Sequence, residues 1–423
     1  MASEIRVNTF KNRSGFGTIT VNDDGANFSG IVTAASFSGN LTGTASTATA
    51  AATAYGLSGS PTLSGISSVS TTNLTVNGNA YPATGPLSNR NLIINGDMQV
   101  DQRGTATGIT GDNYGGPDRY KCFISGAGTW TLSQQADAPS GTGLYYSYKF
   151  QCTSTGTLSA GSYIGHRMIL EGYDSARLNG QQFTISFWVK CNKTGTMTCE
   201  PFDASSGATQ SVSKQFTINA ADTWEYKTIT FPANPHNYPA NNAGALVLHW
   251  WLSAGSTWNS TASTGEWTNF ANGFRAYGCN IDLLDSTSNY FQITGIQLEV
   301  GTVATPFEHR SFSDQLQKCK RYFQAVGSVC SGFVEGTDRF AINVPFNPEM
   351  RASPDISVFS GRTARFRYAA SDIAITNPTL NNTTVQKQGV WTRISTSGKT
   401  NNLPITGRMN GSDADFIAAN AEL

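Results

Sequence analysis

The chain has 423 residues, enough for about three domains of roughly 150 residues each, which excludes a peptide or a disulfide-stapled miniprotein. Charged residues make up only 13% of it, and 28 Lys and Arg balance 28 Asp and Glu. A phosphate-binding surface needs clustered basic side chains that release counterions, and the sequence has no basic run. We therefore expect no nucleic-acid partner.

The cysteines and the hydropathy pattern indicate the cellular compartment in which the chain is made. The seven cysteines are odd in number and include no C-x-x-C pair, so we expect reduced thiols packed in cores. The first residues lack the charged and apolar regions of a signal peptide, and no stretch approaches the roughly 20 apolar residues of a membrane span. These features predict synthesis in a cytoplasm without membrane insertion.

The N-terminal residues are typical of short strands. EIRVN (4–8) and GTITVN (17–22) alternate apolar and polar residues, and Asp24-Gly25 supplies a turn signal after the second. We interpret residues 1–28 as a segment that attaches the chain to a larger assembly.

The following region is almost free of charge. Between Ser14 and Asn89 only Asp23 and Asp24 are charged, and small polar residues alternate with β-branched and other apolar ones. Such a stretch cannot bury enough apolar area within one chain to offset about 1 to 2 kcal/mol of backbone entropy per residue. Three chains wrapped together would bury more. Residues 29–90 therefore predict an extended, intertwined β shaft in a homotrimer, with a flexible linker as the alternative.

From Asn91 the pattern becomes globular and all-β. Runs such as QFTISFWVKC, WEYKTITF, ALVLHWWLS and YFQITGIQLEV predict antiparallel strands, and Asn179-Gly180, Pro232 and Pro235 supply turns between them. Their number and spacing predict a β-sandwich of the jelly-roll type over residues 91–312.

A short helix marks the next boundary. From Ser313, a helical period places four apolar residues on one face, namely Leu316, Cys319, Phe323 and Val326. Ser313 itself can cap this helix. Further strand patterns follow to the end of the chain. Residues 313–423 therefore predict this helix and a second, smaller β domain.

Several segments resemble tail-fibre proteins of tailed bacteriophages. They include NLIINGDMQVDQRG (91–104), FQITGIQLEVGTVATPFEHRSFSDQLQKCKRYFQ (291–324) and VPFNPEMRASP (344–354). The low-charge stretch is similar to shafts of such fibres, notably in phages that infect cyanobacteria. The resemblance implies a homotrimer in the virion tail, bound to other tail or baseplate proteins through its N-terminus. Its jelly roll, similar to carbohydrate-binding modules, and its C-terminal domain would serve host recognition or fibre assembly.

Aromatic residues after residue 245 suggest a glycan site, because sugar rings stack on Trp while their hydroxyls bond amides. In ALVLHWWLS, alternation places Leu246, Leu248, Trp250 and Leu252 in the core and Val247, His249 and Trp251 on the other face. The candidate platform comprises His249, Trp251, Trp258, Asn259, Trp267 and Asn269. Packing or a trimer contact is the alternative for these aromatics. We interpret Trp188 and Trp224 as structural.

Catalysis and metal binding have less support. Glycoside hydrolysis needs two suitably spaced carboxylates, and no distinctive constellation, G-x-S-x-G motif or short β-helix repeat is present. We therefore expect that the chain is not an enzyme. The resemblance implies at most a structural Ca²⁺, for which Asp118 and Asp282 are weak candidates. Ordinary turn aspartates are the alternative, and no other cofactor is expected.

The sequence thus predicts a tail fibre that attaches to host surface polysaccharide through three weak sites acting together. One alternative is a structural baseplate, collar or decoration protein that binds other virion proteins. A virion-bound glycan hydrolase is another.

Overall fold

The computed structural model describes strands near the N-terminus and nearly all of the chain from Ser88 onward. The described residues are 9–11, 17–22, 25–28, 74–76, 79–81 and 88–423, the last range without 206–209, 327–329, 360–362, 369–370, 377, 398, 400–402 and 408–414. Met1–Val69 and Ser70–Leu423 are two compact units. The predicted strand EIRVN and most of the predicted shaft lie outside the described residues.

The N-terminal unit contains one antiparallel sheet of three strands, β1 (Thr9–Lys11), β2 (Gly17–Asn22) and β3 (Gly25–Phe28). The strand predicted from GTITVN is confirmed as β2, which pairs with both neighbours. In the second unit, β4 (Leu74–Val76) and β5 (Asn79–Tyr81) form an antiparallel pair.

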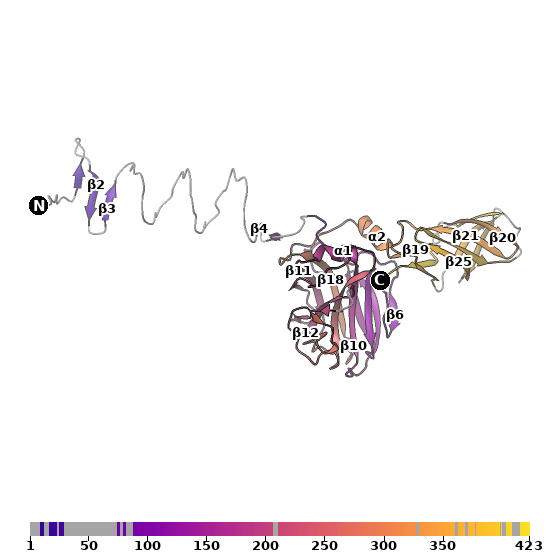
Figure 1. The fold of residues 1–423 in the computed structure, drawn as a ribbon, viewed down its shortest axis with the longest axis horizontal. Coiled ribbons are helices and arrows are strands. Elements are labelled where there is room, and N and C mark those ends of the chain that lie inside the picture. The colour runs from indigo at the N-terminus through magenta and orange to yellow at the C-terminus, as the bar shows by residue number, and fades with distance from the viewer. Residues whose placement is uncertain are drawn as a thin grey trace. The chain divides into compact units, whose positions relative to one another are not determined.

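A jelly-roll-like β-sandwich follows, as predicted (Figure 1). One sheet contains β7 (Tyr120–Ser125), β10 (Tyr163–Glu171), β12 (Gly195–Asp203), β13 (Gln210–Ser211), β14 (Lys214–Ile218), β16 (Gly244–Ala254) and β17 (Thr268–Asn269). Its order is β17-β13-β12-β16-β10-β7, and β14 also pairs with β12. The other sheet contains β6 (Ala106–Ile109), β8 (Thr129–Gln135), β9 (Ser147–Ser154), β11 (Phe183–Cys191), β15 (Glu225–Phe231) and β18 (Tyr290–Val300), in the order β15-β11-β18-β9-β8-β6.

The sandwich core follows from strand alternation. The predicted inward residues of β16, Leu246, Leu248, Trp250 and Leu252, are all buried in one cluster. On β11 the inward residues are Phe183, Ile185, Phe187, Val189 and Cys191, in the same cluster. Each fully buried side chain of this size stabilises the fold by about 1.5 to 3 kcal/mol. All seven cysteines are buried free thiols.

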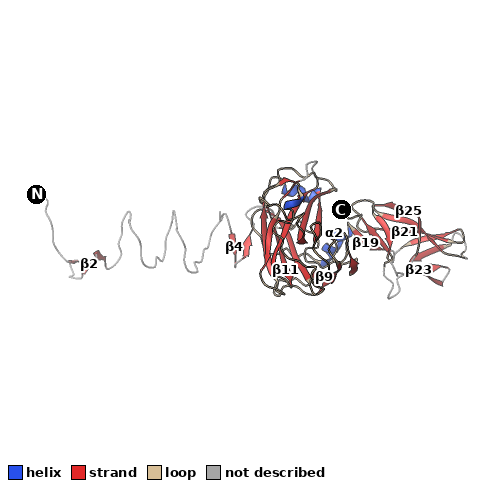
Figure 2. Ribbon diagram, turned by 90° about the horizontal axis from the view of Figure 1, so that it is seen from below, coloured by secondary structure: helices blue, strands red, loops and turns tan. Residues whose placement is uncertain are grey.

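Helix is confined to short segments among the described residues (Figure 2). These are α1 (Gly172–Ser175), η1 (Ala176–Leu178), η2 (Asn272–Phe274) and α2 (Phe312–Lys320). None of the helices found in the described part of the chain has the length and apolar character that crossing a membrane requires.

The helix predicted from Ser313 is present as α2, but its details differ. Ser311 is the cap, and its hydroxyl accepts a hydrogen bond from the backbone N–H of Asp314 at 3.1 Å. Phe323 and Val326 lie beyond the helix, which buries Gln315 and Cys319 instead. The predicted cap was therefore wrong by two residues.

The C-terminal residues form two further antiparallel sheets over one core. The smaller contains β19 (Phe323–Val326), β22 (Asp355–Val358) and β28 (Ile417–Asn420) in the order β19-β28-β22. The larger contains β20 (Ser331–Glu335), β21 (Arg339–Pro345), β23 (Thr363–Tyr368), β24 (Ser371–Thr376), β25 (Leu380–Gln386), β26 (Gly389–Ser395) and β27 (Pro404–Gly407). Its order is β24-β23-β27-β20-β21-β26-β25.

Candidate functional site

The platform predicted on β16 is covered in the structure. His249 is 4% exposed and Trp251 is 1% exposed. Trp251 packs against Phe123 and against Ala276 and Cys279, which belong to the segment that follows β16. Its indole N–H donates to Glu200 at 2.8 Å. Neither buried side chain therefore offers an open stacking surface.

The other predicted platform residues are half-buried or exposed, but most of their polar atoms are already engaged. Trp258 lies 5.6 Å from the Trp251 ring and donates to the carbonyl of Gly161, whereas Trp267 packs on the main core and donates to Pro232. Asn259 bonds the backbone of Gly278 and Cys279. Asn269 is exposed in β17 and accepts a long hydrogen bond from Gln210 at 3.4 Å. The structure thus groups His249, Trp251 and Trp258 but not Trp267.

A buried ionic network lies beneath this covered face. Glu200 is fully buried and accepts hydrogen bonds from Arg275 at 2.8 Å and from Trp251. Burial raises the pKa of Glu200 and lowers that of His249, whose Nδ1 lies 3.5 Å from the Glu200 carboxylate. Arg275 also stacks over Trp251. These contacts hold the covering segment against the sheet.

The two aspartates suggested for Ca²⁺ do not fit a cation. Asp118 is fully buried, accepts from the backbone N–H of Gln102 and lies 3.6 Å from the Arg103 guanidinium. Burial raises the pKa of its carboxyl to about 7. Asp282 accepts the N–H of Leu284, and its carbonyl accepts from the Lys193 ammonium. Within the described ranges, no three His, Cys, Asp or Glu side chains gather as metal ligands.

A different tryptophan remains available for a ligand. Of the eight Trp indole groups, five donate to protein oxygens: those of Trp130, Trp224, Trp251, Trp258 and Trp267. The N–H of Trp250 is buried in the core. Among the residues that the structure describes, the N–H groups of Trp188 and Trp391 have no partner. Both of these half-buried rings line cavities.

Trp188 belongs to a groove on the outward face of the second sheet. It lies on β11 directly opposite Tyr226 of β15, and the ring centroids are 5.2 Å apart at an angle of 44°. Tyr226 is 43% exposed. The groove has a volume of about 530 Å³, within the range of small-molecule sites. Leu144 and Phe307 extend its apolar lining.

Gly295 keeps the floor of this groove open. A Cβ there would lie 2.9 Å from a methyl carbon of Leu144 and 3.1 Å from the Trp188 ring, and the backbone φ is +61°. Only glycine adopts this conformation without strain and without filling the space.

Polar groups surround the aromatic pair. Ser186 and Thr142 supply hydroxyls, of which that of Ser186 bonds Tyr226 and that of Thr142 donates to the carbonyl of Pro139 at 2.7 Å. The Nε2–H of His309 donates to the carbonyl of Thr142 at 3.1 Å. Burial raises the pKa of Tyr226, which keeps the phenol neutral. None of the described residues that line the groove is acidic. The arrangement suits a hydroxylated ring with an apolar face.

Sequence reasoning missed this pair, although alternation contains the signal. Because Phe187 and Val189 point inward on β11, Trp188 between them must point outward. The same argument places Tyr226 outward, since Ile229 and Phe231 of β15 are buried. Only the pairing of the two strands, which the sequence does not reveal, brings the rings together.

No protein-family model matches the chain, and no curated protein matches it. Among solved structures it is similar to the enzymatically active domain of tailspike protein 4 from bacteriophage CBA120, with 12% identity over 50% of this chain and a TM-score of 0.30. The match covers 21% of that tailspike chain.

Two further similarities cover nearly the whole of the other chain. A putative sugar-binding protein from Bacteroides thetaiotaomicron has 10% identity, with 50% of this chain and 99% of that chain covered and a TM-score of 0.26. The CBM22-1 xylan-binding domain of Xyn10C from Paenibacillus barcinonensis has 12% identity, with 51% and 96% covered and a TM-score of 0.26. Similarities at this level do not identify a function.

Proposed function

We propose that this chain is a homotrimeric tail-fibre protein of a tailed bacteriophage that attaches the virion to host-surface glycans. In this proposal the N-terminus binds other tail or baseplate proteins and the jelly roll binds glycan through the Trp188 groove, without catalysis. The resemblance of residues 91–104 and 291–324 to tail-fibre segments supports the fibre role.

One observation carries the glycan-binding part of the proposal. The groove presents two aromatic rings in cross-strand register, one with a free indole N–H, beside hydroxyl groups. Ring faces take the C–H side of a sugar, while the indole N–H donates to a sugar oxygen and the hydroxyl oxygens of the groove accept from sugar hydroxyls. Such a site binds weakly by itself, but three sites on one trimer gain affinity through their high effective concentration.

The decisive experiment compares two tryptophan substitutions in the full chain on an array of neutral bacterial glycans. We expect W188A to weaken binding at least about tenfold, because truncating a central aromatic anchor removes most of such a site. W258A is the matched control, since Trp258 belongs to the platform predicted from sequence and its N–H is already used. Loss of binding in W258A but not in W188A would contradict the groove assignment.

Two further measurements test the rest of the proposal. Antibodies to residues 91–423 should label intact virions, whereas a structural baseplate, collar or decoration protein enclosed by other proteins would stay unlabelled. Incubation with host polysaccharide should release no reducing ends. Their release would support the virion-bound hydrolase instead.

A further inference from the structure

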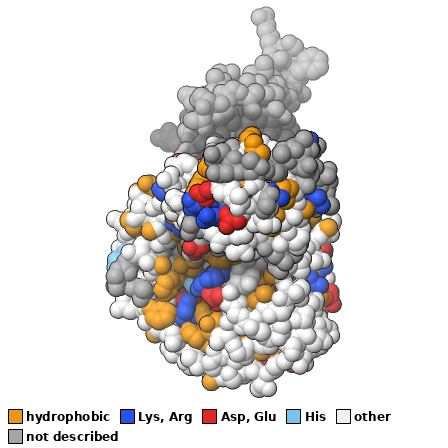
Figure 3. Space-filling view, turned by 90° about the vertical axis from the view of Figure 1, so that its right-hand side faces the viewer, with side chains coloured by type: hydrophobic (Ala, Val, Ile, Leu, Met, Phe, Trp, Pro, Cys, Tyr) orange, Lys and Arg blue, Asp and Glu red, His pale blue; other side chains and the backbone are white. Residues whose placement is uncertain are grey.

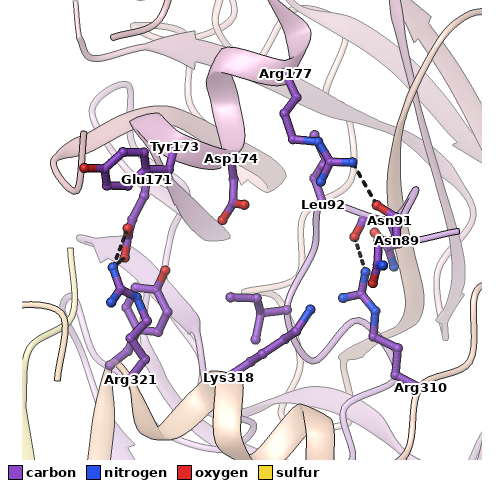
Figure 4. A pocket seen from close by; sticks show the side chains of 12 residues that line it. Asn89, Asn91, Leu92, Glu171, Tyr173, Asp174, Arg177, Arg310, Lys318 and Arg321 are labelled. Atoms are coloured by element: carbon purple, nitrogen blue, oxygen red, sulfur yellow. Dashed lines mark hydrogen bonds and ion pairs between the residues drawn. The ribbon is translucent and has the colours of Figure 1, made fainter. Parts of the chain in front are cut away.

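A second cavity, of about 400 Å³, lies among α1, η1, residues 89–94 and α2. Figure 4 shows its lining side chains. Six of the 12 lining residues are charged, in a chain in which charged residues make up 13%. These six are Glu171, Asp174, Arg177, Arg310, Lys318 and Arg321.

On the face drawn in Figure 3, acidic and basic side chains lie beside one another at several places. Some of the six charged residues of the cavity are paired in the same way. Glu171 is buried and accepts two hydrogen bonds from Arg321, at 2.9 and 3.2 Å. Arg310 pairs with Glu308 at 3.0 Å. These two pairs are internally neutral.

The remaining three charges are not neutralised in pairs. Arg177 donates to the uncharged carbonyl of Asn89 at 3.0 Å. Within the part of the chain that the structure describes, the side chains of Lys318 and Asp174 have no hydrogen bond and no ion pair within 4.0 Å. Figure 4 shows Asp174 entering the cavity from the side of α1 and Lys318 from the side of α2. The three lining side chains Arg177, Lys318 and Asp174 therefore carry a net charge of +1 when all are ionised.

Burial makes the ionised forms of Lys318 and Asp174 energetically unfavourable. It is the main cause that lowers the pKa of Lys318, and repulsion from Arg310 lowers it further. Burial is likewise the main cause that raises the pKa of Asp174, and repulsion from Glu171 adds to it. Both ionised forms have lost water without gaining a hydrogen bond or an ion pair within 4.0 Å, and their attraction for each other offsets only part of that cost. A ligand with complementary groups would relieve both costs at once.

We propose that this cavity binds a hydroxylated carboxylate of single negative charge, of which a uronic acid is the sugar form. The ligand carboxylate accepts hydrogen bonds from Lys318 and Arg177, and ligand hydroxyls donate to Asp174. Asn89 also lines the cavity. This site is separate from the Trp188 groove and does not depend on it. Bridging water is the other possible occupant.

The test is calorimetric titration of the full chain with sodium glucuronate and, separately, with methyl glucoside. Glucuronate should bind and the neutral glycoside should not compete with it. K318Q should weaken glucuronate binding at least about tenfold, because it removes a hydrogen bond between charged groups. K320Q is the matched control: Lys320 lies in the same last turn of α2 but does not line the cavity. It should bind as the unmodified chain does.

A second variant separates a sugar acid from a simple anion. D174N should weaken glucuronate, which loses its hydroxyl acceptor, and should strengthen inorganic phosphate by removing a repelling charge. Equal losses in K318Q and K320Q, or phosphate binding as tight as glucuronate binding, would overturn the proposal. Absence of glucuronate binding would assign the cavity to water. Titration of W188A distinguishes the two sites, because binding that depends on Lys318 and not on Trp188 supports this cavity even if the groove binds nothing.

Discussion

At the scale of single residues, the interior contains ionisable groups that serve packing. His166 is fully buried, and its ring stacks on Trp250 with centroids 4.7 Å apart. Neither ring nitrogen has a hydrogen-bond partner among the described residues. Burial alone lowers its pKa from 6.5 to about 3. The imidazole therefore acts as a neutral aromatic ring in the core.

This burial predicts a pH dependence. Below the unfolded pKa of 6.5 the unfolded chain takes up a proton that the folded chain excludes, so His166 lowers stability as the pH falls from 6.5 towards about 3. The loss is about 1.4 kcal/mol per pH unit. H166F keeps an aromatic ring and removes the titration. Its stability relative to the unmodified chain should rise steadily between pH 6.5 and 4.5 in urea unfolding.

H236F is the control for this measurement, because His236 lies nearer the surface. The stability gained at low pH should be larger in H166F than in H236F, because the ring of His166 is fully buried. If the free energies of unfolding of H166F and the unmodified chain differ by the same amount across this pH range, the folded protein accommodates a protonated His166.

At the scale of elements, alternation predicted which residues share a face but not what covers that face. It placed Leu246, Leu248, Trp250 and Leu252 of β16 correctly in the core. It also placed His249 and Trp251 correctly on the opposite face, yet that face is covered by residues from the next segment. A covering segment depends on long-range packing, which local periodicity does not contain. For the same reason, the sequence did not pair Trp188 with Tyr226.

The start of α2 shows a similar limit. The sequence SFSD offers two serines, and both precede residues of helical pattern. The structure uses Ser311, because its backbone is extended and its hydroxyl reaches the N–H three residues on. Ser313 lies inside the first turn, where its backbone is already helical. Composition alone does not separate the two positions.

This difference gives a matched pair of substitutions. S311A should destabilise the protein by about 1 kcal/mol, because it leaves the N–H of Asp314 without its capping oxygen. S313A should change stability by less than about 0.5 kcal/mol, because exposed helical positions tolerate alanine. Urea unfolding of both variants measures the effect. A larger loss of stability in S313A than in S311A would show that Ser313 is the cap, as the sequence predicted.

At the scale of the whole molecule, residues near the end of the chain tie the C-terminal domain to the jelly roll. The Glu422 carboxylate pairs with Arg119, which directly precedes β7, and both side chains are 2% exposed. Tyr114 donates to the carbonyl of Leu423 at 2.7 Å. Breaking a buried ion pair of this kind costs about 3 to 5 kcal/mol. These contacts join the two β domains within the compact unit Ser70–Leu423.

The compact unit allows a direct test of trimerisation. Light scattering should give the full chain a mass near three times 45.1 kDa. A chain that begins at Ser88 keeps Arg90 and its contacts with Glu308 and Thr305, so both β domains should remain folded. Its trimer should be weaker or absent, because it lacks the low-charge residues whose burial we assign to three intertwined chains.

The outcomes of this measurement bear differently on the proposal. A stable trimer of the shorter chain would place the subunit contacts in the β domains and remove the need for an intertwined shaft. A monomer of both chains would leave residues 29–90 as a linker. It would also remove the avidity argument, because a weak groove on a single chain gains nothing from effective concentration. The Trp188 groove would then have to bind glycan strongly by itself, which the array measurement on the full chain tests directly.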